Sequence, residues 1–292
     1  MPDHPRTVGE LTGILRQGGY LADRGLATAL FLAMSLPRPI LLEGEVGVGK
    51  TETAKVLASV LGRKLIRLQC YEGIDTYQAL YEWDYARQML QIRALSEQQI
   101  AGGEAVDKLF GPKFLLERPL LAAVRAGHRA VLLIDEVDRA DDEFEAFLLE
   151  VLSDFQVSIP EIGTIAAESP PLVVLTSNRT RELHDALKRR CLYHWIGYPA
   201  AERELEIVLV REPGVPPALA RQVVAAVHRM RELDLAKPPG VAETIDWART
   251  LRLLGGTGLD AELAADTLGA VVKDRDDLDV VRDNLEEITS GA

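Results

Sequence analysis

Cysteine is scarce in this sequence of 292 residues, which contains only Cys70 and Cys191. Because the two lie in unrelated sequence contexts, they do not form the kind of paired framework that holds small secreted domains together. Their scarcity indicates a reducing compartment. The 5 histidines are scattered without the spacing of metal ligands, so the sequence gives no reason to expect a zinc site.

Long hydrophobic runs are also missing. The longest apolar run, residues 26–36, ends at Pro37, whereas a membrane-spanning helix needs about 20 apolar residues. Residues 1–10 contain no apolar signal core. Hydrophobic residues make up 47% of the chain and charged residues 27%, which is ordinary for a soluble globular protein. We therefore expect a cytoplasmic protein without a membrane span, built as one large or two medium domains.

Basic residues are outnumbered by acidic ones. The chain has 33 lysines and arginines against 45 aspartates and glutamates, a net charge of −12. An acidic chain is a poor electrostatic partner for the phosphates of nucleic acid or for an anionic membrane surface. The charge balance argues against a nucleic-acid partner, although it is compatible with a local basic face.

The most informative stretch is residues 40–51. Its apolar start resembles a buried strand, the pattern G-x-x-x-x-G-K-T follows from Gly44 to Thr51, and residues 52–61 have a helical pattern. In this order the loop N–H groups and the helix N-terminus surround phosphate oxygens. We expect Lys50 to reach the β- and γ-phosphates of ATP and the Thr51 hydroxyl to hold Mg²⁺. The strand before the loop and the helix after it argue against a chance glycine-rich turn. The residues predicted to bind the nucleotide here are Gly44, Glu45, Val46, Gly47, Val48, Gly49, Lys50, Thr51 and Glu52.

Two acids follow a second buried strand. Residues 130–134 are almost continuously apolar, as expected in a parallel sheet that is covered on both faces, and Asp135 and Glu136 come directly afterwards. Ligands gather at the carboxyl ends of such strands. We predict that Asp135 holds Mg²⁺ through a water molecule next to Thr51 and that Glu136 polarises the water that attacks the γ-phosphate. The alternative is an acidic helix N-terminus before Arg139.

Three further sites have weaker signals. Asn178 follows an apolar strand and is predicted to hydrogen-bond the attacking water or the γ-phosphate, unless it is an ordinary turn asparagine. Arg189 and Arg190 close a predicted helix. They are either favourable charges at a helix C-terminus or an arginine finger for the ATP of a neighbouring subunit. Arg249, in a later helix, is either a contact to the same phosphates or a solvated surface residue.

Strand and helix patterns alternate up to about Tyr198 and then give way to helices alone. This predicts an α/β domain over residues 1–199 and a smaller helical domain over residues 200–292.

The aromatic-rich residues 71–113 are expected to be an insertion, either a peripheral scaffold segment or a loop that contacts nucleotide, neighbouring subunit or partner. Further strands are predicted at 64–69, 172–175 and 192–196, with a hairpin at 155–165. Helices are predicted at 7–36 with a break, 114–126, 141–154, 181–190, 201–211, 216–233, 241–254, 260–272 and 278–288.

These motifs together resemble those of AAA+ ATPases. Residues 44–51, 131–136, 176–178 and 190–191 have the order and approximate spacing of Walker A, Walker B, sensor 1 and the arginine finger. The resemblance implies a P-loop NTPase fold, with a parallel sheet between helices followed by a helical lid. Within AAA+, residues 42–52, 133–140 and 155–165 resemble the MoxR group. The stretches at 66–73 and 81–83 are most similar to its CoxD-like branch.

The resemblance implies several properties of the site and its assembly. It implies an ATP-dependent ring, usually a hexamer with sites between subunits, a helix-2 insert within about 71–113 and a presensor hairpin at about 155–165. It favours Arg190 as the finger, because Arg190 directly precedes Cys191, and makes Arg189 its neighbour. The lid arginine maps to Arg249, although its usual Ser-Pro-Arg context is replaced here by the sequence Asp-Trp-Ala-Arg.

The resemblance also implies a chaperone-like role in the maturation of metalloenzymes, often with a von Willebrand A-domain partner. In CoxD-like members the role is assembly of the molybdenum–copper site of carbon monoxide dehydrogenase. Two other functions compete with ATP-driven remodelling of such a client. A nucleic-acid motor or clamp loader is disfavoured by the net charge and by the lack of an appended DNA-binding module. A non-hydrolysing nucleotide-dependent scaffold is disfavoured by the intact Glu136.

Overall fold

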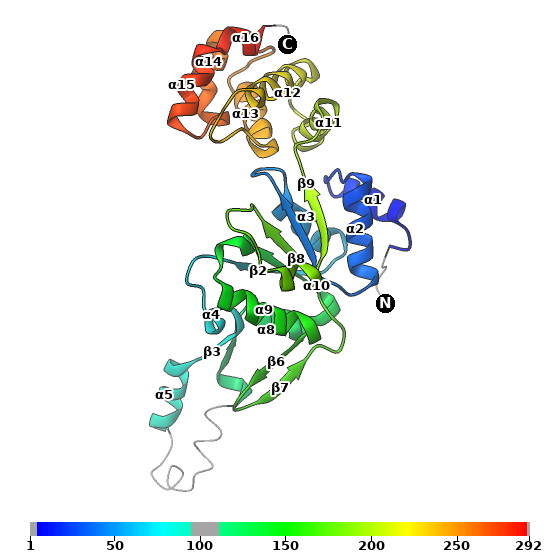
Figure 1. Ribbon diagram of the computed structural model, residues 1–292, viewed down its shortest axis with the longest axis vertical. Helices are drawn as coiled ribbons and strands as arrows, with labels where there is room; N and C mark the ends of the chain where they lie inside the picture. Colours follow the sequence, from blue (N-terminus) through cyan, green and yellow to red (C-terminus); the bar gives the residue numbers. More distant parts are fainter. Residues whose placement is uncertain (1–4, 95–110, 291–292) are drawn as a thin grey trace. The chain divides into compact units, whose positions relative to one another are not determined.

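The computed structural model describes residues 5–94 and 111–290 (Figure 1). The chain forms two compact units. The first comprises residues 1–18, 22–43 and 53–194, and the second comprises residues 19–21, 44–52 and 195–292. The loop between the first strand and the third helix therefore belongs to the second unit, together with the C-terminal helices. The domain limits predicted from the sequence, 1–199 and 200–292, stay a prediction.

A five-stranded sheet organises the first unit, with the strand order β2-β5-β8-β1-β9. The strands are β1 (Ile40–Gly44), β2 (Lys64–Gln69), β5 (Ala130–Asp135), β8 (Leu172–Ser177) and β9 (Leu192–Ile196). Strands β2, β5, β8 and β1 pair in parallel, and β1, β5 and β8 are buried along their whole length. The predicted parallel sheet and its strands are confirmed, with β8 running two residues beyond the predicted 172–175.

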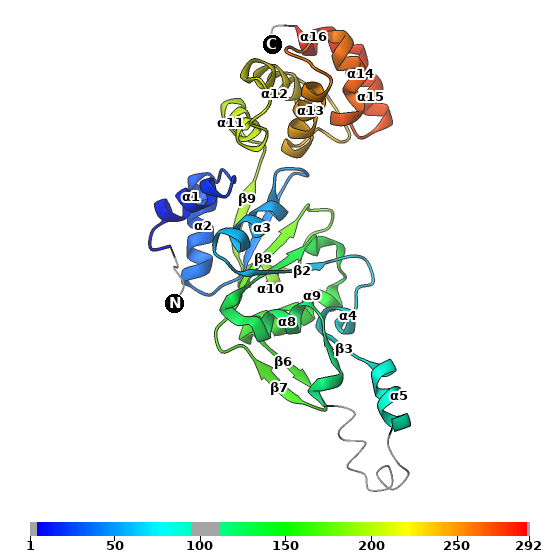
Figure 2. The same ribbon diagram turned by 180° about the vertical axis from the view of Figure 1, so that it is seen from behind.

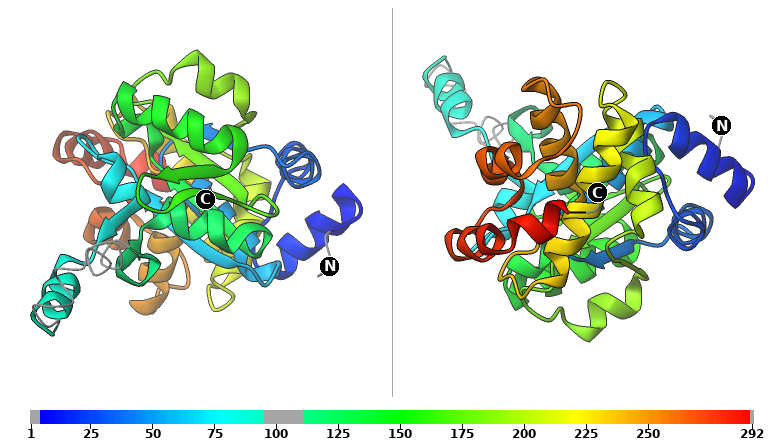
Figure 3. Two further views of the ribbon diagram at one scale, coloured as in Figure 1. Left: turned by 90° about the horizontal axis from the view of Figure 1, so that it is seen from below. Right: turned by 90° about the horizontal axis from the view of Figure 1, so that it is seen from above.

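Helices pack against this sheet and bury its apolar faces. Figure 3 shows α1 and α2 side by side at one edge of the first unit, with α5 on the opposite side. The buried core joins strand residues such as Leu132 and Val173 to Leu121 of α8 and Leu148 of α9. The α-helices up to β9 are α1 (Val8–Gln17), α2 (Arg24–Ser35), α3 (Lys50–Val60), α4 (Thr76–Leu80), α5 (Tyr85–Ala94), α8 (Pro119–Ala126), α9 (Asp142–Asp154) and α10 (Asp185–Arg190). Short 3-10 turns are η1 (Pro112–Phe114), η2 (Gly127–Arg129) and η3 (Val137–Arg139).

Two small antiparallel sheets accompany the main one. Strand β3 (Tyr81–Trp83) pairs with β4 (Leu115–Glu117), and β6 (Gln156–Ile159) pairs with β7 (Gly163–Ala166). The second pair confirms the hairpin predicted at 155–165. Of the insertion predicted over residues 71–113, residues 95–110 lie outside the described part of the chain. Its described part contains α4, β3, α5 and η1 (Figure 1).

Two helices predicted in the first unit are wrong at their starts. The predicted helix 114–126 begins only at Pro119, because a proline favours the first helical position and keeps the preceding residue extended; Arg118 has φ −89° and ψ 171°. The predicted helix 181–190 begins only at Asp185, with His184 as its N-cap. Contacts to Glu145 hold the residues before it in a non-helical path.

Glu145 of α9 fixes this path from inside the protein, where its side chain is fully buried. Its carboxylate accepts a hydrogen bond from the His184 backbone N–H, at 2.8 Å, and pairs with the Arg181 guanidinium. Arg181 also donates to the carbonyl oxygen of Ala140, at 2.6 Å. The segment that leads from β8 into α10 is thereby anchored to α9.

We expect Glu145→Ala to lower the free energy of unfolding by about 1–3 kcal/mol, because it leaves the His184 N–H without its acceptor and removes the buried carboxylate partner of Arg181. Urea unfolding followed by circular dichroism measures this loss. Glu150→Ala, on the exposed face of the same helix, should change the stability by about 0.5 kcal/mol or less. Equal effects of the two substitutions would contradict the anchoring role of Glu145.

The second unit contains helices only, over the described residues 201–290 (Figure 2). Its core contains residues from every helix of α11 to α16, with Val223, Trp247 and Leu268 among those that are buried. The predicted helix 278–288 is wrong, since the chain forms two helices that meet at Asn284. None of the described helices is long and apolar enough to cross a membrane. The helices are α11 (Ala201–Arg211), α12 (Pro217–Glu232), α13 (Val241–Leu253), α14 (Ala261–Val271), α15 (Arg275–Asp283) and α16 (Leu285–Thr289).

Candidate active site

The loop between β1 and α3, residues 44–51, is called the phosphate loop below. Gly47 and Gly49 have φ values of +76° and +92°, in the region that favours glycine. A Cβ atom on Gly44 would collide with the carbonyl oxygen of Ile196. Its last two residues, Lys50 and Thr51, are the first residues of α3, so the helix N-terminus lies at the end of the loop. A glycine-rich loop that leads into a helix N-terminus suits the binding of phosphate oxygens, because such loops offer backbone N–H groups and the helix dipole to an anion.

Side chains of the phosphate loop divide into buried and exposed ones. Lys50 is only 6% exposed, and its ammonium group donates to the carbonyl oxygens of Gly44 and Glu45, at 2.8 and 2.6 Å. Val48 is buried and Val46 exposed, so Val48 offers a ligand only its backbone. Glu52 forms an ion pair with Arg211 of α11, at 2.9 Å.

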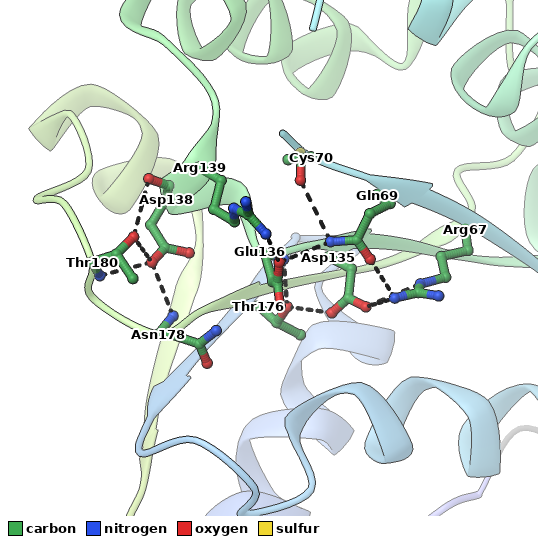
Figure 4. A network of polar contacts seen from close by, with 10 residues as sticks. All are labelled: Arg67, Gln69, Cys70, Asp135, Glu136, Asp138, Arg139, Thr176, Asn178 and Thr180. Atoms are coloured by element: carbon green, nitrogen blue, oxygen red, sulfur yellow. Dashed lines mark hydrogen bonds and ion pairs between the residues drawn. The ribbon is translucent and has the colours of Figure 1, made fainter. Parts of the chain in front are cut away.

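The acid Asp135 lies at the carboxyl end of β5 and is almost fully buried, at 2% exposure. One of its oxygens accepts a hydrogen bond from the Thr176 hydroxyl, at 2.6 Å. The other accepts from Arg67 Nε and a terminal nitrogen of the same guanidinium, at 3.0 and 2.6 Å. Figure 4 shows these contacts. Asp135 is thus held in one orientation by the neighbouring strands β2 and β8.

Its neighbour Glu136 has a different environment. Glu136 adopts a left-handed backbone conformation, φ +54° and ψ +51°, which costs about 1–3 kcal/mol in a residue other than glycine. Its N–H donates to the Thr176 hydroxyl oxygen, at 2.9 Å. Its carboxylate is partly exposed and accepts from the Gln69 amide, at 3.0 Å, and from Arg139, at 3.2 Å. The two adjacent acids therefore have separate surroundings, one buried and fixed and one open to solvent (Figure 4).

Arg67 and Gln69 connect the two acids, and sequence reasoning missed both. The Arg67 guanidinium also hydrogen-bonds the side-chain oxygen of Gln69, which leaves the Gln69 amide nitrogen directed at Glu136. The sequence contained only part of the signal for this pair, because it marks the strand but not the strand that lies next to it. Residues two apart on a strand share a face, and β2 lies beside β5 with Gln69 opposite Asp135.

Asn178 follows β8 and is positioned through its backbone. Its N–H donates to Asp138, at 3.2 Å, and the Thr180 N–H and hydroxyl donate to the same carboxylate oxygen, at 2.8 and 2.7 Å. Asp138 is buried and belongs to η3, directly after the acid pair. The Asn178 side chain makes no hydrogen bond to the other residues drawn in Figure 4. Asp138 is, after Arg67 and Gln69, a third residue that sequence reasoning missed.

The two cysteines lie buried in the first unit. Burial raises the pKa of the Cys70 thiol to about 12, with Asp135, Asp138 and Glu136 adding to the effect. Burial also raises the pKa of Cys191 to about 12, against the lowering effect of Arg38. Because the thiolate is the reactive form, both cysteines should be inert near neutral pH.

We expect a thiol reagent at pH 8 to label the native protein on the order of 10³-fold more slowly than the unfolded chain, since a raised pKa depletes the thiolate at any pH below it. Labelling should accelerate as the pH rises towards 12. The measurement is iodoacetamide modification followed by mass spectrometry, with and without guanidinium chloride. Native cysteines that react as fast as those of the unfolded chain would contradict the burial of both thiols.

The predicted finger residues Arg189 and Arg190 end α10 and are exposed. Their backbone carbonyls accept hydrogen bonds from the Arg38 guanidinium, at 3.0 Å for Arg189 and 3.1 and 3.3 Å for Arg190. Neither guanidinium has an ion-pair partner within the part of the chain that the structure describes. Lys188, by contrast, pairs with Glu182, at 3.2 Å. The backbone at the end of α10 is therefore fixed, while the two guanidinium groups are exposed and can contact another molecule.

The predicted lid arginine, Arg249, lies in α13 of the second unit. Arg249 pairs with Glu212 at the end of α11, with its Nε at 2.9 Å, and this hydrogen bond lowers the pKa of Glu212. The acidic side chain of α13 that lies beside the phosphate loop is Glu243. One of its oxygens is 2.7 Å from the position that a Cβ on Gly47 would occupy. Contact of Arg249 with nucleotide stays a prediction.

Comparison with known proteins agrees with this architecture. The family model of the AAA domain (dynein-related subfamily) matches residues 39–191. The chain is 29% identical over 203 residues to the chaperone MoxR1 of Mycobacterium tuberculosis, which covers 68% of this chain and 46% of MoxR1. It is 26% identical over 240 residues to the protein NorQ of Paracoccus denitrificans, covering 80% of this chain and 78% of NorQ.

Solved structures show the same fold. A point mutant of Thermotoga maritima RuvB superimposes with a TM-score of 0.51 at 16% identity, covering 99% of this chain and 82% of RuvB. The chain spans less than half the length of MoxR1. Membership of the CoxD-like branch stays a prediction. The similarity to MoxR1 agrees with the predicted resemblance to the MoxR group of AAA+ ATPases. The family model covers more than half of the sequence, and the chain therefore belongs to the dynein-related AAA domain family.

Proposed function

We propose that the chain binds ATP with Mg²⁺ and hydrolyses it to remodel a client protein. In this proposal the N–H groups of the phosphate loop and Lys50 bind the phosphates, and Thr51 and Asp135 hold Mg²⁺. Glu136 takes a proton from the water that attacks the γ-phosphate, while Asn178 orients that water. Arg190, with Arg189 beside it, neutralises charge on the ATP of a neighbouring subunit.

The single observation that carries the proposal is the contrast between the two adjacent acids. Asp135 is buried and fixed by donors on both oxygens, whereas the Glu136 carboxylate is partly exposed beside Gln69. Hydrolysis needs two carboxylates with different roles. One must stay ionised and in place, while the other exchanges a proton with water.

The donor set fits magnesium. The Asp135 carboxylate and the Thr51 hydroxyl are hard oxygen ligands of the kind that Mg²⁺ prefers. When bound, Mg²⁺ neutralises negative charge on the phosphates. The protein's own contribution is to hold Asp135 in a single orientation, through Thr176 and Arg67, before the ion arrives.

Members of the AAA+ family are typically oligomeric, and we propose a ring, a hexamer, for this chain. The guanidinium groups at the end of α10, which are exposed and have no ion-pair partner among the described residues, support this arrangement. We further propose that the client is a metalloenzyme resembling molybdenum–copper carbon monoxide dehydrogenase, with a von Willebrand A-domain protein as partner. The support for a chaperone role is the similarity to MoxR1, which is named a chaperone.

The test is a paired measurement on the purified protein. Phosphate release from ATP is followed with and without Mg²⁺, and the assembly is sized by light scattering with ATP and without nucleotide. We expect Mg²⁺-dependent turnover and assembly beyond a monomer, and Lys50→Ala should remove both ATP binding and turnover. A wild-type protein that stays monomeric with ATP and releases no phosphate would refute the proposal.

A further inference from the structure

The phosphate loop packs against the start of α13 within the second unit. The Ala242 N–H donates to the Gly47 carbonyl, at 3.1 Å. A Cβ on Gly240 would lie 2.7 Å from the Gly47 Cα and 2.7 Å from the Val46 carbonyl oxygen. The two backbones therefore touch at a pair of glycines, and a side chain at Gly240 would displace the phosphate loop.

The segment 239–244, called the brace below, is held in shape by its own side chains. The Gly240 N–H donates to the Glu243 carboxylate, at 3.0 Å. The Thr244 hydroxyl shares its proton between the Gly240 carbonyl, at 3.0 Å, and a carboxylate oxygen of Glu204, at 2.6 Å. These bonds fix the N–H and the carbonyl of Gly240. The backbone of this residue touches the phosphate loop.

The buried carboxylate of Glu204 fixes the brace through its hydrogen bonds to Thr244 and Arg231. Glu204 of α11 is fully buried and accepts from two nitrogens of Arg231, at 2.6 and 2.8 Å, and from His228, at 2.9 Å. Arg231 in turn donates to the Pro239 carbonyl, at 2.7 Å, and lies over the Tyr198 ring at 4.3 Å. Loss of one partner from such a buried network is costly, so the network holds the brace in a single position.

The geometry of the peptide bond links the contact between Gly47 and the brace to the binding of phosphate. In a planar trans peptide the carbonyl of one residue and the N–H of the next point in opposite directions. Because the Gly47 carbonyl points at the brace, the Val48 N–H points away from it. The brace thus sets the direction of one of the N–H groups that the proposed function assigns to phosphate binding.

We infer that the brace, with Gly240 and Thr244 as positioning residues, sets the conformation of the phosphate loop and thereby its affinity for a nucleoside triphosphate. This inference rests on the proposed nucleotide binding of the same loop. It places control of that affinity in α11, α12 and α13, outside the residues that touch phosphate.

The first test substitutes Gly240→Ala in the full chain and measures the Kd of a fluorescent ATP analogue with Mg²⁺. We expect binding to weaken by about tenfold, the effect of losing one well-placed hydrogen bond. The matched control is Gly269→Ala in α14, where a Cβ would meet none of the described residues within 4 Å. The control should bind as the wild type does.

The second test remains informative if Gly240→Ala fails to fold. Thr244→Val keeps the side-chain shape and removes the hydroxyl that joins Gly240 to Glu204, and it should weaken binding several-fold. Its control is Thr267→Val, which removes another buried hydroxyl of this unit, the acceptor of the Trp247 indole N–H at 2.8 Å. Thermal melting shows how much stability each valine variant loses.

The outcomes separate this inference from the proposed function. A wild type that does not bind the analogue refutes nucleotide binding itself. A wild type that binds, together with folded brace variants of unchanged Kd, overturns the role of the brace. Equal weakening by Thr244→Val and Thr267→Val would also overturn it, because general destabilisation would then account for both.

Discussion

Glutamine in place of Glu136 should reduce ATP turnover by about 10²–10⁴-fold, the usual contribution of a positioned general base, while nucleotide binding stays intact. The amide has nearly the same shape as the carboxylate and retains an oxygen that can accept from Gln69 and Arg139, as the carboxylate does. It cannot take a proton from water. Phosphate release at saturating ATP, beside the Kd of a fluorescent analogue, measures the two effects separately.

A matched control for this change is Glu150→Gln, an exposed position of α9 that should leave turnover unchanged. Normal turnover in the Glu136 variant would exclude Glu136 from the mechanism. With ATP bound and hydrolysis blocked, the same variant should hold its client longer than the wild type does. Affinity capture with it would therefore identify the client, and a von Willebrand A-domain protein or a molybdoenzyme subunit would support the proposed role.

The acid pair was predictable from the sequence because its signal is local. In a chain that also contains a glycine-rich phosphate loop, an uninterrupted apolar strand that ends in two carboxylates indicates a magnesium and phosphate site. Arg67 and Gln69 were not predicted, since their role depends on which strand lies next to β5. The sequence marks β2 as a strand, but its position beside β5 follows from the packing of the whole sheet.

The errors in helix limits also have physical causes. Residues 114–126 were predicted as one helix, yet Pro119 keeps Arg118 extended, and before it β4 pairs with β3. Residues 181–184 are kept out of the helix by Glu145, a contact across 39 residues of sequence from His184 that no local pattern reveals. Tertiary contacts of this kind override local propensity.

In the second unit the sequence predicted the helices but not which of their turns would meet the phosphate loop. Sequence reasoning and the family resemblance both pointed to Arg249, which the structure pairs with Glu212. Gly240 and Glu243, at the other end of the same helix, lie beside Gly47. A helix of 13 residues is about 20 Å long, so its ends meet different neighbours, and periodicity cannot say which end faces the loop.

Alanine in place of Arg190 should lower turnover by about 10³–10⁵-fold if the residue acts as an arginine finger, because a guanidinium that neutralises the γ-phosphate contributes about that much in other nucleotide hydrolases. The Arg190→Ala variant should still fold. Arg38 binds the backbone carbonyl of residue 190 rather than its side chain, so the end of α10 keeps its support. Lys188→Ala, two residues away and paired with Glu182, is the matched control and should have a small effect.

Mixing distinguishes a finger that acts on a neighbouring subunit from one that acts within its own. The Arg190→Ala protein keeps Lys50 and the acid pair, and the Lys50→Ala protein keeps Arg190. In a mixed ring, a site from the first protein can meet a finger from the second, so the mixture should regain activity that neither variant has alone. If no activity returns although mixed assemblies form, Arg190 has a structural role, and the site would have to be complete within one subunit.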